Sequence, residues 1–149
     1  MTPYPDVVEM VQSDLLVKRS TVVVDATGVG GPVVDLLRRS QLGCGVVPVT
    51  ITSGDGEGSD ERGFRVPKRD LITGLQVAFQ KRWLDVAARG GAVEAFVQEL
   101  VATRVRVSES GHARFGARSG HDDLVMAAAL AWWRVRRMWP VGGVKGRLV

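Results

Sequence analysis

Three aspartates of this sequence stand where a carboxylate can hold a divalent cation. Asp25 ends the apolar run of residues 21–25 and precedes a glycine-rich turn, and the adjacent pair Asp122 and Asp123 precedes the apolar stretch of residues 124–133. Mg²⁺ and Mn²⁺ prefer such hard oxygen ligands, brought together from separate elements. The competing interpretations are structural: Asp25 only hydrogen-bonds the amides of its turn, and Asp122 caps the helix that follows it.

The glycine-rich turn after Asp25 does not complete a nucleotide-binding motif. A dinucleotide fingerprint would need a glycine at Val33, and a P-loop would need Gly-Lys-Ser/Thr where Gly31 is followed by Pro32. A carboxylate at the strand end would also repel the phosphate that a helix N-terminus attracts. We therefore expect the glycines to keep side chains away from Asp25 and to leave room for a phosphodiester.

The positive charge of the chain is unevenly distributed. Seven Lys and Arg residues lie between positions 62 and 89 against two Asp, and five basic residues lie between position 134 and the end, with no acid. Such clusters suit a polyanion such as nucleic acid, because each cation that neutralises a phosphate releases counterions. Composition alone equally allows a solvated basic surface.

The composition indicates a globular domain. The 149 residues are 45% hydrophobic, which is enough for a substantial core. The single cysteine, Cys44, excludes an internal disulfide and a multi-cysteine metal site, so a reducing compartment is expected. The longest apolar stretch is too short to span a bilayer, so we expect neither membrane insertion nor secretion. We assign residues 1–139 to the domain and residues 140–149 to a basic flexible tail.

The elements that must position these residues follow an α/β pattern. Residues 53–63 are expected to form a surface loop. In an α/β sheet, ligands gather at the carboxyl ends of the strands, so Asp25 should lie there and meet the acidic pair. The apolar spacing predicts helices at residues 5–17, from Pro32, from residue 68, at 92–102 and at 122–137, parallel strands at 21–25 and 46–52, a short strand in 83–87, and a hairpin at 104–117.

Four segments, in this order and spacing, resemble the C-terminal nuclease domain of phage large terminase subunits. They are VVVDATGVGGPVVDLL (22–37), VPKRDLI (66–72), VQEL (97–100) and HDDLVMAAALA (121–131). The resemblance covers residues 2–133. It implies an RNase H-like fold, a mixed sheet flanked by helices, and a carboxylate cluster that binds two Mg²⁺ or Mn²⁺ ions.

The resemblance implies a role for each acidic site. Asp25, Asp122 and Asp123 match the metal-binding, catalytic carboxylates, and His121 beside them is of the type that assists proton transfer or orients a ligand, unless it is an ordinary loop residue. The implied reaction is hydrolysis of double-stranded DNA, in which one ion lowers the pKa of the attacking water and the other stabilises the leaving 3′ oxygen. Lys68 matches a lysine near the DNA backbone.

The expected DNA contacts come from the first basic cluster. Besides Lys68, they are Arg65, Arg69, Lys81 and Arg82.

Two parts of the family's pattern do not occur in the chain. They are the first strands of the sheet, with their acid, and the ATPase motif G-x-x-x-x-G-K-[ST]. We therefore expect little or no DNA cleavage by the chain alone. Expected partners are the terminase ATPase domain, the small terminase subunit and the portal, in the cytoplasm of a bacterial host. The alternatives are a non-catalytic DNA-binding or packaging-complex module and a small nucleotide-binding α/β protein.

Overall fold

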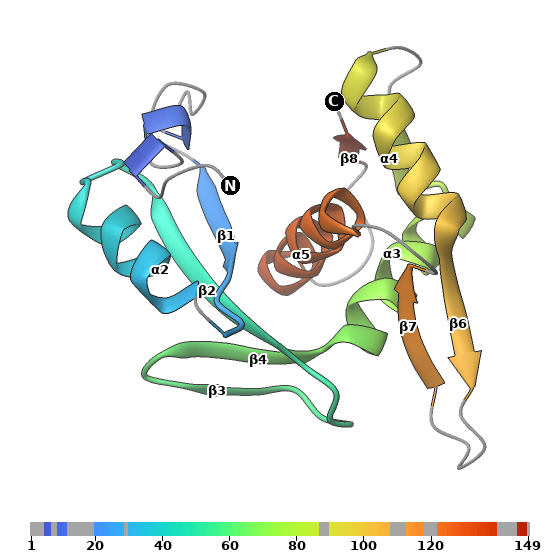
Figure 1. Ribbon diagram of the computed structural model, residues 1–149, viewed down its shortest axis with the longest axis horizontal. Coiled ribbons are helices and arrows are strands. Elements are labelled where there is room, and N and C mark those ends of the chain that lie inside the picture. The colour runs from blue at the N-terminus through green and yellow to red at the C-terminus, as the bar shows by residue number, and fades with distance from the viewer. Residues whose placement is uncertain are drawn as a thin grey trace. The chain divides into compact units, whose positions relative to one another are not determined.

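The structure of the chain is a computed structural model that divides into two compact units, Met1–Pro67 and Lys68–Val149 (Figure 1). The residues that it describes are 5–6, 9–11, 20–28, 30–86, 90–107, 113–117, 122–139 and 146–148. Residues 5–6 and 9–11 are helical, and the rest of the helix predicted at 5–17 lies outside the described residues. Each unit is described by itself.

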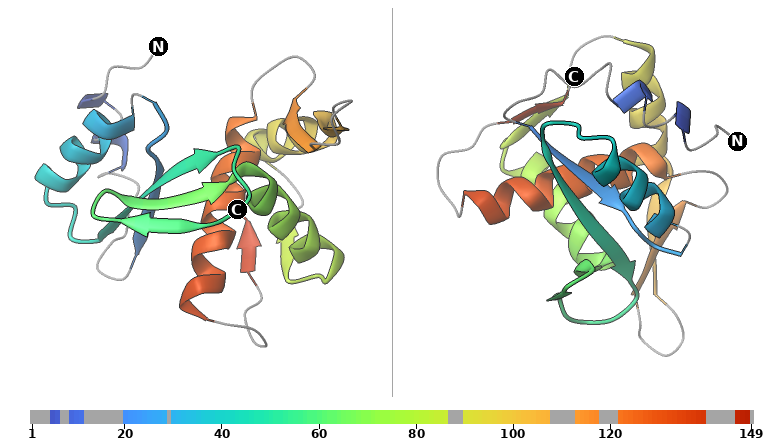
Figure 2. Two further views of the ribbon diagram at one scale, coloured as in Figure 1. Left: turned by 90° about the horizontal axis from the view of Figure 1, so that it is seen from below. Right: turned by 90° about the vertical axis from the view of Figure 1, so that its left-hand side faces the viewer.

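The first unit contains an open, mixed sheet of four strands in the order β1-β2-β4-β3. Strands β1 (Thr21–Asp25) and β2 (Gly45–Thr52) are parallel, and so are β2 and β4 (Gly63–Pro67). Helix α2 (Gly30–Arg39) connects β1 to β2 and contacts both. The left view of Figure 2 shows β2, β4 and β3 lying side by side. The predicted parallel pair and the α/β class are therefore confirmed.

The segment predicted to be a surface loop contains part of a hairpin. Strand β3 (Gly58–Asp60) pairs antiparallel with β4, so the prediction for residues 53–63 was wrong in this part. It failed because β3 has no apolar residue whose alternation would indicate a strand. Gly63 begins β4 with a φ of +141°, and its added Cβ would lie 2.4 Å from the Pro48 carbonyl oxygen of β2, so glycine is required here.

The described residues of the second unit form three helices and several short strands. Helix α3 (Lys68–Gln80) is followed by β5 (Leu84–Val86), α4 (Gly91–Ala102) and the antiparallel hairpin of β6 (Thr103–Val107) and β7 (Ala113–Ala117). Helix α5 (Asp123–Met138) comes next, and β8 (Gly146–Leu148) pairs with β5 in parallel. The helices and the hairpin agree with the predictions. Residues 146–148, however, form a strand where a flexible tail was predicted. The prediction failed here because β8 is held by pairing with β5, which is far from it in sequence.

The core of the second unit is built around α5. Helix α5 contacts both α3 and α4. The rings of Trp83 and Trp132 lie 6.1 Å apart, those of Phe79 and Phe96 lie 6.4 Å apart, and the Arg137 guanidinium stacks 5.2 Å from the centre of a Trp133 ring. These contacts hold α5 within the unit, and the acidic pair lies at its other, N-terminal end. The buried side chains of α5 are Val125, Met126, Ala128, Ala129, Leu130, Trp132 and Trp133.

Candidate functional site

The first candidate residue, Asp25, lies at the carboxyl end of β1 with an exposed side chain. Its Oδ1 accepts a hydrogen bond of 2.9 Å from the Thr27 N–H, which closes a turn directly after the strand. The Thr27 hydroxyl oxygen accepts a bond of 2.9 Å from the Ile51 N–H and so ties the turn to β2. Asp25 therefore stabilises its own turn through one oxygen. Its Oδ2 has no hydrogen-bond partner among the described residues.

Two glycines of this turn are required by the backbone. Gly28 has a φ of +61°, in the left-handed region that glycine adopts without strain. At Gly30, an added Cβ would lie 2.5 Å from the Asp25 carbonyl oxygen, so α2 begins in direct contact with the end of β1. A Cβ at Gly31 would meet nothing within 4 Å. The glycines thus allow α2 to start beside Asp25.

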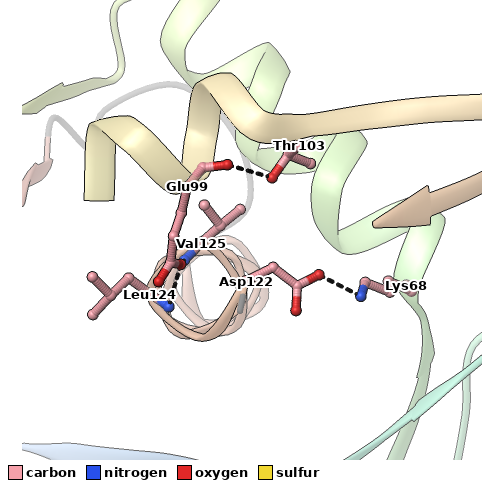
Figure 3. A network of polar contacts seen from close by, with 6 residues as sticks. All are labelled: Lys68, Glu99, Thr103, Asp122, Leu124 and Val125. Carbon is pink, nitrogen blue, oxygen red and sulfur yellow. Dashed lines mark hydrogen bonds and ion pairs between the residues drawn. The ribbon is translucent and has the colours of Figure 1, made fainter. Parts of the chain in front are cut away.

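The second candidate carboxylate is held by a lysine. Asp122 immediately precedes α5, and its Oδ2 accepts a hydrogen bond of 2.6 Å from the Nζ of Lys68, the first residue of α3 (Figure 3). The two side chains are only 32% and 22% exposed, so solvent screens this ion pair less than a surface pair. Two residues predicted from sequence are therefore brought together. Lys68 here neutralises a candidate metal-binding carboxylate.

The N-terminus of α5 is capped from another helix. The capping role predicted for Asp122 was wrong, because its side chain makes no cap hydrogen bond. Instead, Oε2 of Glu99 in α4 accepts bonds from the N–H groups of Leu124, at 2.8 Å, and Val125, at 3.2 Å (Figure 3). Since Glu99 satisfies these amides, the Asp122 carboxylate is directed to Lys68.

Sequence reasoning missed the role of Glu99, although one signal was present. An acid in the last turn of a helix is disfavoured by the partial negative charge of that terminus. Glu99 lies in this position in α4, which ends at Ala102. Such an acid indicates a positively polarised partner elsewhere, and here that partner is the start of α5.

The other predicted DNA contacts differ in their ion pairing. Arg65 pairs with Asp60 at 2.9 Å, and Arg69 pairs with Asp70 at 3.3 Å, all with exposed side chains. Exposed pairs of this kind contribute little to stability and exchange readily with other partners. The exposed pair Lys81 and Arg82, in the turn after α3, makes no ion pair among the described residues. Their positive charge is therefore not neutralised locally.

The predicted convergence of the three aspartates stays a prediction. Asp25 belongs to the first unit, whereas Asp122 and the exposed Asp123 belong to the second. Within the described residues of either unit, no three Asp, Glu, His or Cys side chains gather closely enough to hold a metal ion. His121 lies outside the described residues.

Comparisons of this chain with protein-family models, curated proteins and solved structures find no match. In the part of the chain that the structure describes, no helix combines the length and the apolar character needed to cross a membrane. The functional assignment therefore depends on the side chains described above and on the motifs of the sequence.

Proposed function

We propose that the chain forms the C-terminal part of a divalent-metal-dependent nuclease domain with an RNase H-like fold, acting on double-stranded DNA. One observation carries the proposal: the start of α5 has an acid from α4 as its cap, and the Asp122 carboxylate pairs with a lysine instead. A helix whose first amides are already bonded to Glu99 does not need Asp122 and Asp123 for capping. The oxygens of Asp122 and Asp123 are hard ligands of the kind that Mg²⁺ and Mn²⁺ prefer, so a divalent cation is a suitable partner for this pair.

In this proposal each described residue has a distinct task. Asp25, Asp122 and Asp123 hold two Mg²⁺ or Mn²⁺ ions, and when bound, the ions supply the activated water and the stabilisation of the leaving 3′ oxygen. Asp25 offers its unbonded Oδ2, since Oδ1 is used by the turn. Lys68 orients the Asp122 carboxylate and offers its ammonium group to a phosphate.

An asparagine at position 25 separates the metal-binding role from the structural one. Asp25→Asn keeps an oxygen that accepts the Thr27 N–H bond, so the turn should be preserved while the negative charge is lost. We expect Asp25→Asn and Asp122→Asn each to weaken Mn²⁺ binding by roughly tenfold, as measured by calorimetry or electron paramagnetic resonance. Asp35→Asn, at an exposed position of α2, is the matched control. Equal Mn²⁺ affinities in all variants would contradict the proposal.

Cleavage is measured separately, as Mn²⁺-dependent nicking of supercoiled plasmid. The chain alone should nick the plasmid little or not at all. Fusion of an upstream strand that carries an acid should restore nicking, and Asp25→Asn should abolish the restored activity. Nicking by the fusion that survives Asp25→Asn would show that Asp25 is not a catalytic carboxylate.

A non-catalytic DNA-binding module is the second candidate, and the charges of Lys81 and Arg82, which make no ion pair with another described residue, favour it. Both candidates predict salt-dependent binding to DNA of any sequence. The two candidates differ in their metal requirement, because only the nuclease needs divalent cations bound at the aspartates. DNA binding together with an absence of Mn²⁺ binding would therefore favour the second candidate.

A further inference from the structure

Strand β1 forms one edge of the four-stranded sheet, and among the described strands only β2 pairs with it. The Ala26 N–H donates a hydrogen bond of 2.8 Å to the Val49 carbonyl oxygen, which shows that the main-chain groups of Ala26 face β2. Because the main-chain groups of successive strand residues point in alternate directions, every second residue of β1 turns away from β2. The residues whose main-chain groups face the open edge are Thr21, Val23 and Asp25.

Within the described residues of β1, the sequence features that usually protect an edge strand from pairing do not occur. The sequence of β1, TVVVD, contains four β-branched residues and neither lysine nor proline, and residues 21–24 are half-buried. Strand β3, at the opposite edge, has three residues, GSD, and only polar side chains. A regular apolar edge is a template for another strand, whereas a short polar edge is not. The two edges of this sheet therefore differ in their capacity to associate.

We infer that β1 pairs with β1 of a second copy of this chain, antiparallel about a two-fold axis through Val23. In an antiparallel ladder, a residue whose main-chain groups face the partner exchanges two hydrogen bonds with its opposite. The main-chain groups of Val23 face the open edge, so Val23 can pair with Val23 of the second copy. The contact is therefore self-complementary and closes as a dimer. Thr21 of each copy then lies opposite Asp25 of the other.

The residues at the ends of the paired strands are compatible in charge. They also limit the number of main-chain hydrogen bonds between the two copies. A threonine opposite an aspartate brings no like charges together. The Asp25 carbonyl oxygen lies against Gly30, where an added Cβ would be 2.5 Å from it, so Asp25 contributes its N–H alone. This leaves about four main-chain hydrogen bonds across the two-fold axis. The dimer joins two four-stranded sheets into one continuous sheet, and it forms whether or not the chain cuts DNA.

Opposite charges placed at Thr21 test the register of this pairing. Sedimentation velocity over a wide concentration range should show a reversible monomer–dimer equilibrium. Thr21→Lys brings a cation opposite Asp25 at two symmetric places and should tighten the dimer by roughly tenfold, whereas Thr21→Asp should weaken it by a similar factor. Added salt should diminish both effects. A chain that is monomeric throughout, or two variants that shift the equilibrium in the same direction or not at all, would overturn the inference.

A cross-link provides a second measurement that does not depend on affinity. In the Cys44→Ser background, Val23→Cys places two thiols across the axis, with Cα atoms about 5.5 Å apart, within the range of a disulfide. Oxidation should therefore yield a covalent dimer. Asp35→Cys, exposed on α2 away from the edge, should remain monomeric under the same conditions. Equal cross-linking of the two variants, or failure of Val23→Cys to cross-link, counts against β1 pairing.

Discussion

Replacing Glu99 by Ala should destabilise the second unit by about 2 kcal/mol. A helix cap contributes about 1 kcal/mol, and a negative charge at a helix N-terminus adds about 0.5–1 kcal/mol. Glu99 supplies both, through its bonds to the amides of Leu124 and Val125 at 2.8 and 3.2 Å. The bond to Val125 is partly buried, so water replaces it poorly when the carboxylate is removed. Glu99→Gln keeps an acceptor oxygen and should cost about half as much as Glu99→Ala.

Tryptophan fluorescence in urea measures this effect selectively, because all four tryptophans of the chain lie in residues 68–149. The unfolding midpoint reports the second unit, and the slope should be unchanged. Glu94→Gln is the charge-matched control for Glu99→Gln, since it removes an exposed charge from the first turn of α4 and should cost only the loss of the dipole interaction, about 0.5 kcal/mol. If the two Gln variants are equally stable, Glu99 does not cap α5 in solution.

Three further predictions concern other residues of the two units. Gly30→Ala should destabilise the first unit by about 2 kcal/mol in thermal melts followed by circular dichroism, because its Cβ would lie 2.5 Å from a carbonyl oxygen. Gly31→Ala, with nothing within 4 Å, should be neutral or slightly stabilising, and equal melting of the two variants would contradict the geometry. A double-mutant cycle of Lys68→Met and Asp122→Asn in urea should give a coupling energy of about 1 kcal/mol, whereas additive effects would mean that the pair is not formed. Arg82→Gly should stabilise the protein by about 1 kcal/mol, because a φ of +55° favours glycine, and should lower the salt slope of DNA binding by about 1. An unchanged slope would leave Arg82 without a DNA contact.

The sequence predicted those elements whose residues carry a local pattern. The apolar run that ends at Asp25, the helix that starts around Pro32 and the β-branched residues of 46–52 each contain their own signal, so the parallel β1–α2–β2 unit was found. Strand β3 was missed because its three polar residues are held only by pairing with β4. Strand β8 was missed because it pairs with β5, which is distant in sequence.

The candidate site was predicted to a similar extent. Asp25, Asp122 and Lys68 were predicted as site residues from their types and positions in the sequence. No local pattern indicated that Lys68 and Asp122, 54 positions apart, would form an ion pair. The local rule that an aspartate before a helix caps it failed at Asp122, because Glu99 from a second helix competes for the same amides. Such competition is decided by tertiary packing, which a single-sequence pattern does not contain.

The cap supplied by Glu99 has a consequence for the order in which this region folds and opens. Helix α5 cannot satisfy its first amides by itself, so its N-terminal turn is completed only when α4 packs against it. Detachment of α4 and fraying of that turn are then one cooperative event. The position of Asp122 therefore depends on the α4–α5 interface, where Phe96 is buried, and a substitution there would loosen the carboxylate without touching it.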